Sequence, residues 1–233
     1  TLQEVLEEDP GKVANIFSTS GTATDANVEF MLASADTRPS HLVSDDGYEV
    51  NITVAASQAE MEGSSIPSPD GTSPIVISSS NNTLKMKVNG NTGSEIRIAE
   101  GSYTSGAELA EAIENAVNSD SELDENYIEV RFVDEGGGNG HFLFNTEEYG
   151  SDATIEFMDV TSDSIYSDIG VSTGHYRRGT DVAGTINGEE ATGNGQFLTG
   201  KDGNEYTDGL RLKVNLTREQ LSAQGGGQGR VTV

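Results

Sequence analysis

The chain has 233 residues, of which 39 are Asp or Glu and 13 are Lys or Arg, so its formal net charge is −26. Such an acidic chain lacks the basic stripe of nucleic-acid-binding proteins and is repelled by anionic membrane surfaces. The absence of cysteine excludes disulfides, thiolate zinc sites and cysteine nucleophiles. No apolar run approaches the ~20 residues of a membrane span. We therefore expect no nucleic-acid partner and no membrane insertion.

The first quarter of the chain changes from a helical to a strand-like pattern. Residues 1–17 predict a short helix interrupted at Pro10. Apolar and polar residues then alternate over 28–32 and, most clearly, over 47–54, which predicts two half-buried strands. Residues 63–74 are rich in Gly, Ser and Pro and indicate a linker or a long loop.

The middle of the chain combines short strands with one amphipathic helix. Strands over 75–79 and 84–89 end at Asn89-Gly90, a typical tight turn. Residues 107–117 carry an apolar stripe at helical spacing, with Ser105 as the expected N-cap. Further elements are expected as strands at 127–133, 141–146 and 154–158 and as a short helix within 160–169.

The last part returns to strands and turns. Residues 182–186 meet Asn187-Gly188, a second hairpin signal, and residues 210–214 alternate again. Gly-rich residues 225–229 precede a final strand.

These patterns predict a predominantly β, α+β protein with two domains, one inserted into the other. We expect an antiparallel β domain in two segments, 21–74 and 173–233, around an α+β domain at 75–172. Residues 1–20 form a separate helical segment in this scheme.

No constellation of residues indicates catalysis or a cofactor. Acidic pairs arise by chance in a chain with 39 carboxylates. His41, His141 and His175 have no metal-ligand spacing, and we interpret them as solvated loop residues. A Ser-His-Asp triad stays open because its members are not local in sequence, but no GxSxG motif supports one. The prediction is a protein that is not an enzyme and holds no cofactor.

One stretch has some features of a calcium loop. Asp202, Asn204 and Asp208 alternate as oxygen ligands, but the twelve-residue pattern and its terminal Glu are incomplete. A β-hairpin loop is therefore favoured over a calcium loop, and no metal site is predicted. The glycine runs at 136–140 and 225–229 do not match a phosphate-binding loop.

Two stretches resemble the family of bacterial flagellar filament-capping proteins, FliD or hook-associated protein 2. The residues from Val13 to Asp25, followed by VEFMLASADTRPS and GYEVNITVAASQAEMEG, are similar to the segment that leads into that family's head. The residues LKMKVNG, IRIAEGSYTSGAELAEAIENAVN and HFLFNTEEYGSDATIEF, within about 83–158, resemble the flagellin hook IN motif.

A third stretch, DVAGTINGEEATGNGQFLTG at 181–200, carries the most specific resemblance, and GLRLKV at 209–214 belongs with it. The resemblance implies a split head domain around a motif-bearing one, with residues 1–20 as a remnant of the leg domain. It also implies a structural role: a ring-like oligomeric cap at the distal filament tip. Such a cap, exported to the cell exterior by the flagellar secretion system, promotes flagellin polymerisation, with adhesion to a host surface or mucin as a further role.

The exposed loops are the expected contact surfaces of such a head. The candidate residues are Asn89, Gly90, Gly136, Gly138, Asn139, Asp202, Asn204 and Asp208. The alternative function is an extracellular adhesin or a β module that binds glycan or calcium.

Overall fold

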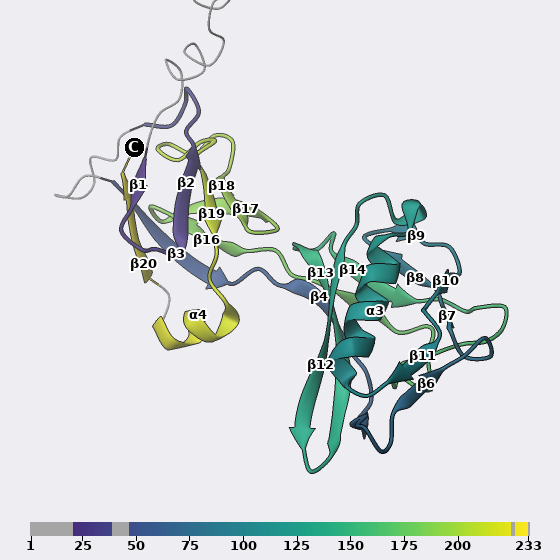
Figure 1. Ribbon diagram of the computed structural model, residues 1–233. Helices are drawn as coiled ribbons and strands as arrows, with labels where there is room; N and C mark the ends of the chain where they lie inside the picture. The colour runs from purple at the N-terminus through teal and green to yellow at the C-terminus, as the bar shows by residue number, and fades with distance from the viewer. Residues whose placement is uncertain (1–20, 39–46, 225–226, 233) are drawn as a thin grey trace, which may run out of the picture. The chain divides into compact units, whose positions relative to one another are not determined.

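The computed structural model describes residues 21–38, 47–224 and 227–232 (Figure 1). The helix expected at 1–17 and His41 lie outside these residues. The chain divides into two compact units, one made of Thr1–Ala56 with Asp181–Val233 and the other of Ser57–Thr180. Strands predominate in both, which confirms the predicted α+β, mainly β class.

The units divide at 56/57 and 180/181, whereas the sequence placed the boundaries at 74/75 and 172/173. The reason is that β4 (Gln58–Glu62) and β5 (Ile66–Pro67) both pair with β13 (Asn139–Tyr149), so the Gly/Ser/Pro-rich stretch belongs to the second unit. Ser57 and Thr180, where the chain enters and leaves this unit, exchange backbone hydrogen bonds of 2.9 and 3.2 Å. Adjacent ends of this kind are what an inserted domain requires.

The first unit is one eight-stranded antiparallel sheet in the order β1-β20-β3-β16-β17-β18-β19-β2. Its strands are β1 (Thr22–Ala23), β2 (Val28–Leu32), β3 (Tyr48–Val54), β16 (Ala183–Ile186), β17 (Glu189–Asn194), β18 (Phe197–Gly200), β19 (Arg211–Val214) and β20 (Gly227–Thr232). The two strands at the ends of this order, β1 and β2, follow each other in the chain and lie close together, so the sheet nearly closes on itself. A short helix, α4 (Arg218–Gln224), packs beside β3.

Alternation explains the core of this sheet. Tyr48, Val50 and Ile52 on β3 are buried, while Val54 at the strand end is 39% exposed. The turn between β16 and β17 has positive φ at Asn187 (55°) and Gly188 (77°), which confirms the predicted hairpin. The final strand is also present as β20.

The second unit combines small sheets with one long helix. Its strands, besides β4 and β5, are β6 (Ile75–Ile77), β7 (Thr83–Leu84), β8 (Met86–Val88), β9 (Asn91–Thr92), β10 (Ile96–Arg97), β11 (Gly101–Tyr103), β12 (Ile128–Gly136), β13, β14 (Thr154–Phe157) and β15 (Tyr176–Arg178). Its helices are α3 (Gly106–Asn118) and the 3₁₀ turn η1 (Ser121–Leu123). Four-stranded sheets form in the orders β12-β13-β4 with β5, and β15-β14-β8-β9.

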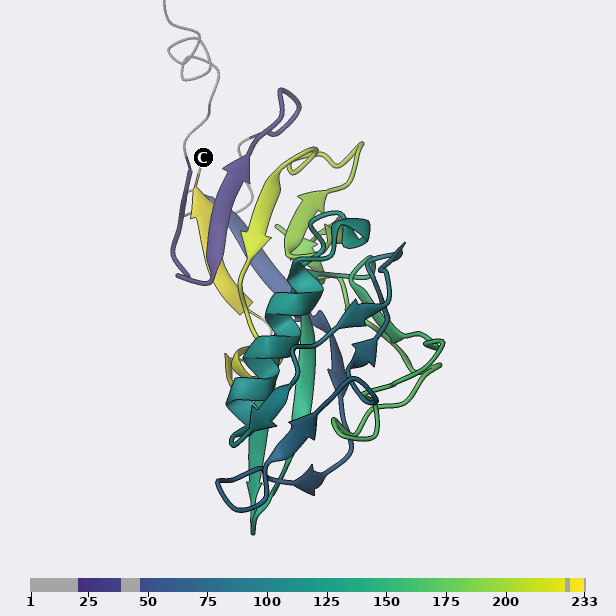
Figure 2. The ribbon, with the colours of Figure 1, turned by 45° about the vertical axis from the view of Figure 1, so that its right-hand side comes forward.

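Helix α3 packs against β12 and protects its free edge (Figures 1 and 2). The helix begins after Ser105, whose hydroxyl accepts a hydrogen bond from the Glu108 N–H as predicted. From its last two turns, Asn118 accepts from the Ile128 N–H at 2.9 Å and Glu114 accepts from the Val130 N–H at 2.8 Å. Side chains thus take the place of a neighbouring strand along this part of β12.

The core of the second unit is aromatic at its centre. The rings of Phe144 and Phe157 pack edge to face at 5.0 Å, and those of Phe157 and Tyr166 at 5.6 Å. Tyr166 belongs to the stretch 160–169, for which the sequence predicted a helix. The structure has bends, a bridge and a turn there, because Ser164 bridges to Thr83 and the side chains of Ile165 and Tyr166 are buried in the core. The turn ends at Gly170, with φ of 68°.

Replacing Tyr166 by Phe tests this anchor. Its hydroxyl lies 2.5 Å from the Met158 carbonyl and accepts from the Lys85 N–H at 3.0 Å, and burial raises the pKa of Tyr166 above 10.0. We expect Tyr166→Phe to lower the free energy of unfolding by about 1 kcal/mol at pH 7. Since the folded-state pKa is raised, this contribution is complete below pH 10.0 and is lost as the pH rises through the folded value. Urea denaturation at pH 7 and pH 11 measures it, and an advantage of the wild type that grows with pH would contradict the assignment.

In the part of the chain that the structure describes, no helix is long and apolar enough to cross a membrane.

Candidate interaction loops

The Asn89-Gly90 turn between β8 and β9 is held in place by hydrogen bonds of the Asn89 side chain. The Asn89 side chain accepts from the Thr154 N–H at 2.9 Å and donates to Asn126 at 3.0 Å. It therefore ties the turn to β14 and to the segment after η1, while Gly90 is exposed at φ of 88°. Of this predicted pair, Gly90 is the more exposed residue.

The tip of the β12–β13 hairpin is exposed throughout. Gly136, Gly138 and Asn139 lie there exposed to solvent, and a Cβ added at either glycine would have no atom within 4 Å. Gly136, Gly137 and Gly138 have φ between 68° and 83°, a region that favours glycine. The tip is thus a protruding turn whose surface is mostly backbone.

His141, interpreted from the sequence as a solvated loop residue, is instead buried on β13, with 9% of its surface exposed. Its Nδ1 lies 2.6 Å from a Glu135 carboxylate oxygen, and its Nε2 lies 3.4 Å from Glu62. Hydrogen bonds from Ser65 and His141 lower the pKa of Glu135. The imidazole is buried because β12 and β4 flank β13 on both sides, a pairing that the local sequence does not reveal. His175, in contrast, is exposed as predicted.

The loop between β18 and β19 is organised around a carboxylate. Glu189, at the start of β17, accepts hydrogen bonds from the Glu205 N–H (2.8 Å), the Thr207 N–H (2.9 Å) and the Thr207 hydroxyl (2.7 Å). The Tyr206 N–H lies 3.3 Å from the same group. Converging N–H donors stabilise an anion and disfavour a cation.

Two of the three predicted loop residues hold this loop by hydrogen bonds. Asp208 accepts from the Gly203 N–H at 2.7 Å, and Asn204 donates to the Glu190 carbonyl at 2.9 Å and to the Thr207 hydroxyl at 2.8 Å. Asp202 is exposed. The oxygen ligands of a calcium loop are therefore not directed at one point. Among the described residues, no group of three or more acidic or His side chains is placed to hold a metal ion.

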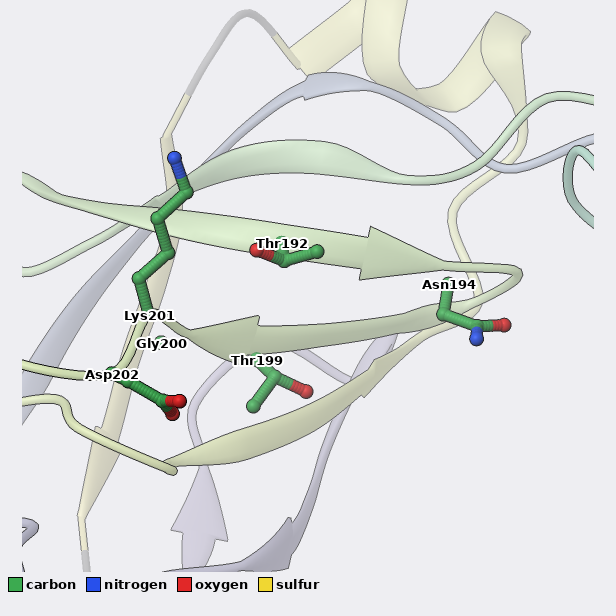
Figure 3. A pocket seen from close by; sticks show the side chains of 6 residues that line it. All are labelled: Thr192, Asn194, Thr199, Gly200, Lys201 and Asp202. Atoms are coloured by element: carbon green, nitrogen blue, oxygen red, sulfur yellow. The ribbon is translucent and has the colours of Figure 1, made fainter.

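Beside this loop lies an open hollow of about 510 Å³ on the outer face of the sheet. Figure 3 shows Thr192 on β17 next to Thr199 on β18, with Asn194 at one end and Lys201 and Asp202 at the other. Thr192 and Thr199 are opposite each other in register. The hollow is open to solvent, so it suits a surface contact and offers no enclosed site for chemistry.

Sequence reasoning missed Glu189 and the His141 cluster. Glu189 looks like any surface acid next to Glu190, and its partners lie 16 to 18 residues further along the chain. The only available signal was the position of Glu189 directly after the Asn187-Gly188 turn, which fixes where its side chain emerges.

Comparison with known proteins gives matches in structure alone. No protein-family model and no curated protein sequence matches the chain. Among solved structures, the D2-D3 domains of the flagellar cap protein FliD from Escherichia coli cover 92% of this chain and 98% of their own, with a TM-score of 0.53 and 16% identity. FliD from Bdellovibrio bacteriovorus covers 91% and 99%, with a TM-score of 0.51 and 13% identity. The D2-D3 domains of FliD from Serratia marcescens cover 82% and 94%, with a TM-score of 0.52 and 14% identity.

These structural neighbours confirm the fold that the resemblance implied. The chain has the fold of flagellar cap D2-D3 domains over nearly its whole length.

Proposed function

We propose that the chain is the head region of a bacterial flagellar filament cap, located at the distal tip of the filament outside the cell. The observation that carries this proposal is the whole-length match to cap D2-D3 domains together with the split β unit around an inserted α+β unit. The stretch 181–200, whose resemblance is the most specific, forms β16, β17 and β18 at the centre of the first unit.

In this role the head works by contact. A cap forms a ring-like oligomer on the filament end and promotes the polymerisation of exported flagellin beneath it. The described residues present exposed loops and a shallow hollow, and such surfaces suit protein contacts. No cofactor or catalytic group is needed. Adhesion to a host surface or mucin is a further role for the outward loops.

The alternative is an extracellular adhesin or a β module that binds glycan or calcium. The hollow at Thr192 and Thr199 favours the glycan version, because solvated hydroxyls line it. The loop at 202–208 gives calcium no support, since its backbone donors surround Glu189.

Deletion of residues 21–232 in the organism that encodes the chain tests the proposal. We expect cells to lose long filaments and to release unpolymerised flagellin into the medium, with both defects restored by the wild-type gene. The matched control is Gly71→Ala, at a site with open space around it, which should leave filaments normal. Normal filaments in the deletion strain, with lost surface adhesion, would instead support the adhesin.

A further inference from the structure

One sheet of the second unit is charged oppositely at its two edges. The order β15-β14-β8-β9 makes β15 an edge strand, and η1 packs beside β9 at the other edge. The middle is balanced, because Glu156 on β14 lies opposite Lys87 on β8 in register. The two edges therefore carry the net charge of this surface.

The β15 edge is basic in a unit that is otherwise acidic. Residues 57–180 contain 22 Asp and Glu but only six Lys and Arg, and two of those six are Arg177 and Arg178 on β15. Both arginines are exposed, and Tyr176 beside them is 52% exposed. Because β4 lies beside β15 within the same unit, the strand offers a partner its side chains: two guanidinium groups and an aromatic ring.

Neither arginine is neutralised within the described part of the chain. Arg177 donates to the Tyr176 carbonyl at 3.1 Å, and Arg178 donates to the Ser151 carbonyl. No ion pair between either guanidinium and a described carboxylate is present. Consecutive strand residues point to opposite faces, so the two arginines put one positive charge on each face of β15, and each is available to an acidic partner.

The opposite edge is acidic and firmly held. Asp120, Glu122, Asp124 and Glu125 lie in and around η1. Asp120 fixes this segment to β9's neighbour Ser94, accepting from its N–H at 2.7 Å and from its hydroxyl at 3.0 Å. Glu122 and Glu125 are exposed. The predicted contact turn at Asn89 joins this edge through its bond to Asn126.

We propose that the β15 edge of one copy of this chain binds the η1 edge of the next copy. The partner is a second copy because the complementary charge is on this chain itself, at the far edge of the same sheet. A contact between two different edges is head-to-tail, the kind of interface that generates rings when the rotation closes. This inference rests on the proposed cap function and names the surface that would join neighbouring subunits.

The repulsion between two copies of net charge −26 makes this contact weak in dilute solution. Subunits held together on a filament end experience an effective concentration on the order of 1 mM, where a weak contact is populated. The test is therefore made at about 1 mM protein.

The natural absence of cysteine allows a direct test. The variant Arg177→Cys/Glu122→Cys, treated with a short bismaleimide, should give a ladder of covalent dimers, trimers and longer species. Both residues are exposed, and the one hydrogen bond given for the Arg177 side chain goes to the adjacent Tyr176 carbonyl, so both substitutions should preserve the fold. Each single variant should give dimers at most. A double variant that gives no species beyond the dimer would overturn the proposal.

Charge exchange in the same background separates recognition from random collision. Arg178→Glu or Glu125→Lys alone should lower the yield of trimers and longer species about tenfold, and the two together should restore it. Failure of this reciprocal rescue would overturn the proposal. The proposal would also be overturned if heparin, a sulfated polysaccharide, protected the Arg177→Cys thiol from maleimide while the double variant gave no ladder of covalent species. That result would assign the edge to a glycan. Normal capping in cells with no ladder would reject this interface alone and leave the proposed function standing.

Discussion

Gly193→Ala is expected to destabilise the first unit by at least about 3 kcal/mol. Among the described glycines, this is the position where an added Cβ would make the shortest contact. A Cβ at Gly193 would lie 1.7 Å from the Val182 carbonyl oxygen. That oxygen is backbone, so the methyl group can be accommodated only if the start of β16 moves away from β17. Gly200 on the next strand is similarly confined, because a Cβ added there would lie 1.8 Å from the Thr207 carbonyl oxygen.

Urea denaturation followed by circular dichroism measures the effect. Gly71→Ala is the matched control, because a Cβ at Gly71 has no atom within 4 Å, and it should change stability by less than about 0.5 kcal/mol. Equal denaturation midpoints for Gly193→Ala and the wild type would show that β16 and β17 are not packed as described.

Glu189→Gln should lower the free energy of unfolding by about 2–3 kcal/mol. The carboxylate accepts from two N–H groups and one hydroxyl at 2.7–2.9 Å, and an amide offers one oxygen acceptor and one competing N–H₂ group. Donors in the 205–207 backbone would lose their partner, so this loop should also open more often.

Glu190→Gln is the matched control on the adjacent residue. Its carboxylate pairs with Lys201 at 2.7 Å but its side chain is 78% exposed, so the change should have little effect on the free energy of unfolding. Amide hydrogen exchange at 205–207 should accelerate in Glu189→Gln and not in Glu190→Gln. Equal behaviour of the two variants would contradict the account of the loop.

Gly193 and Glu189 both belong to the stretch 181–200, and each has a structural role there. Gly193 and Gly200 allow strands to approach the neighbouring backbone closely, and the Asn187-Gly188 turn places Glu189 under the next loop. Residues within the stretch of strongest resemblance therefore help to build the sheet.

Local chemistry predicted the local elements well. Alternation identified β3, the two Asn-Gly pairs identified their hairpins, and the apolar stripe with Ser105 identified α3 almost to its ends. Each of these depends on contacts between residues close in sequence.

The failures were all long-range. The stretch 63–74 looked like a linker because its composition is that of a loop, yet β5 within it is ordered by pairing with a strand about 70 residues away. His141 looked solvated because it follows a glycine hairpin, whereas β4 covers it from the other side. The four-stranded sheet with oppositely charged edges contains both β8 and β15, which are far apart in the sequence, and no local pattern predicts that they share a sheet.

The location of the protein on the filament tests the central proposal most directly. Antibodies raised against residues 57–180, used with gold labelling and electron microscopy on intact cells, should mark the distal tip of each filament. We predict label confined to that tip. Label along the filament sides or over the cell surface, with bare tips, would contradict the assignment as a cap.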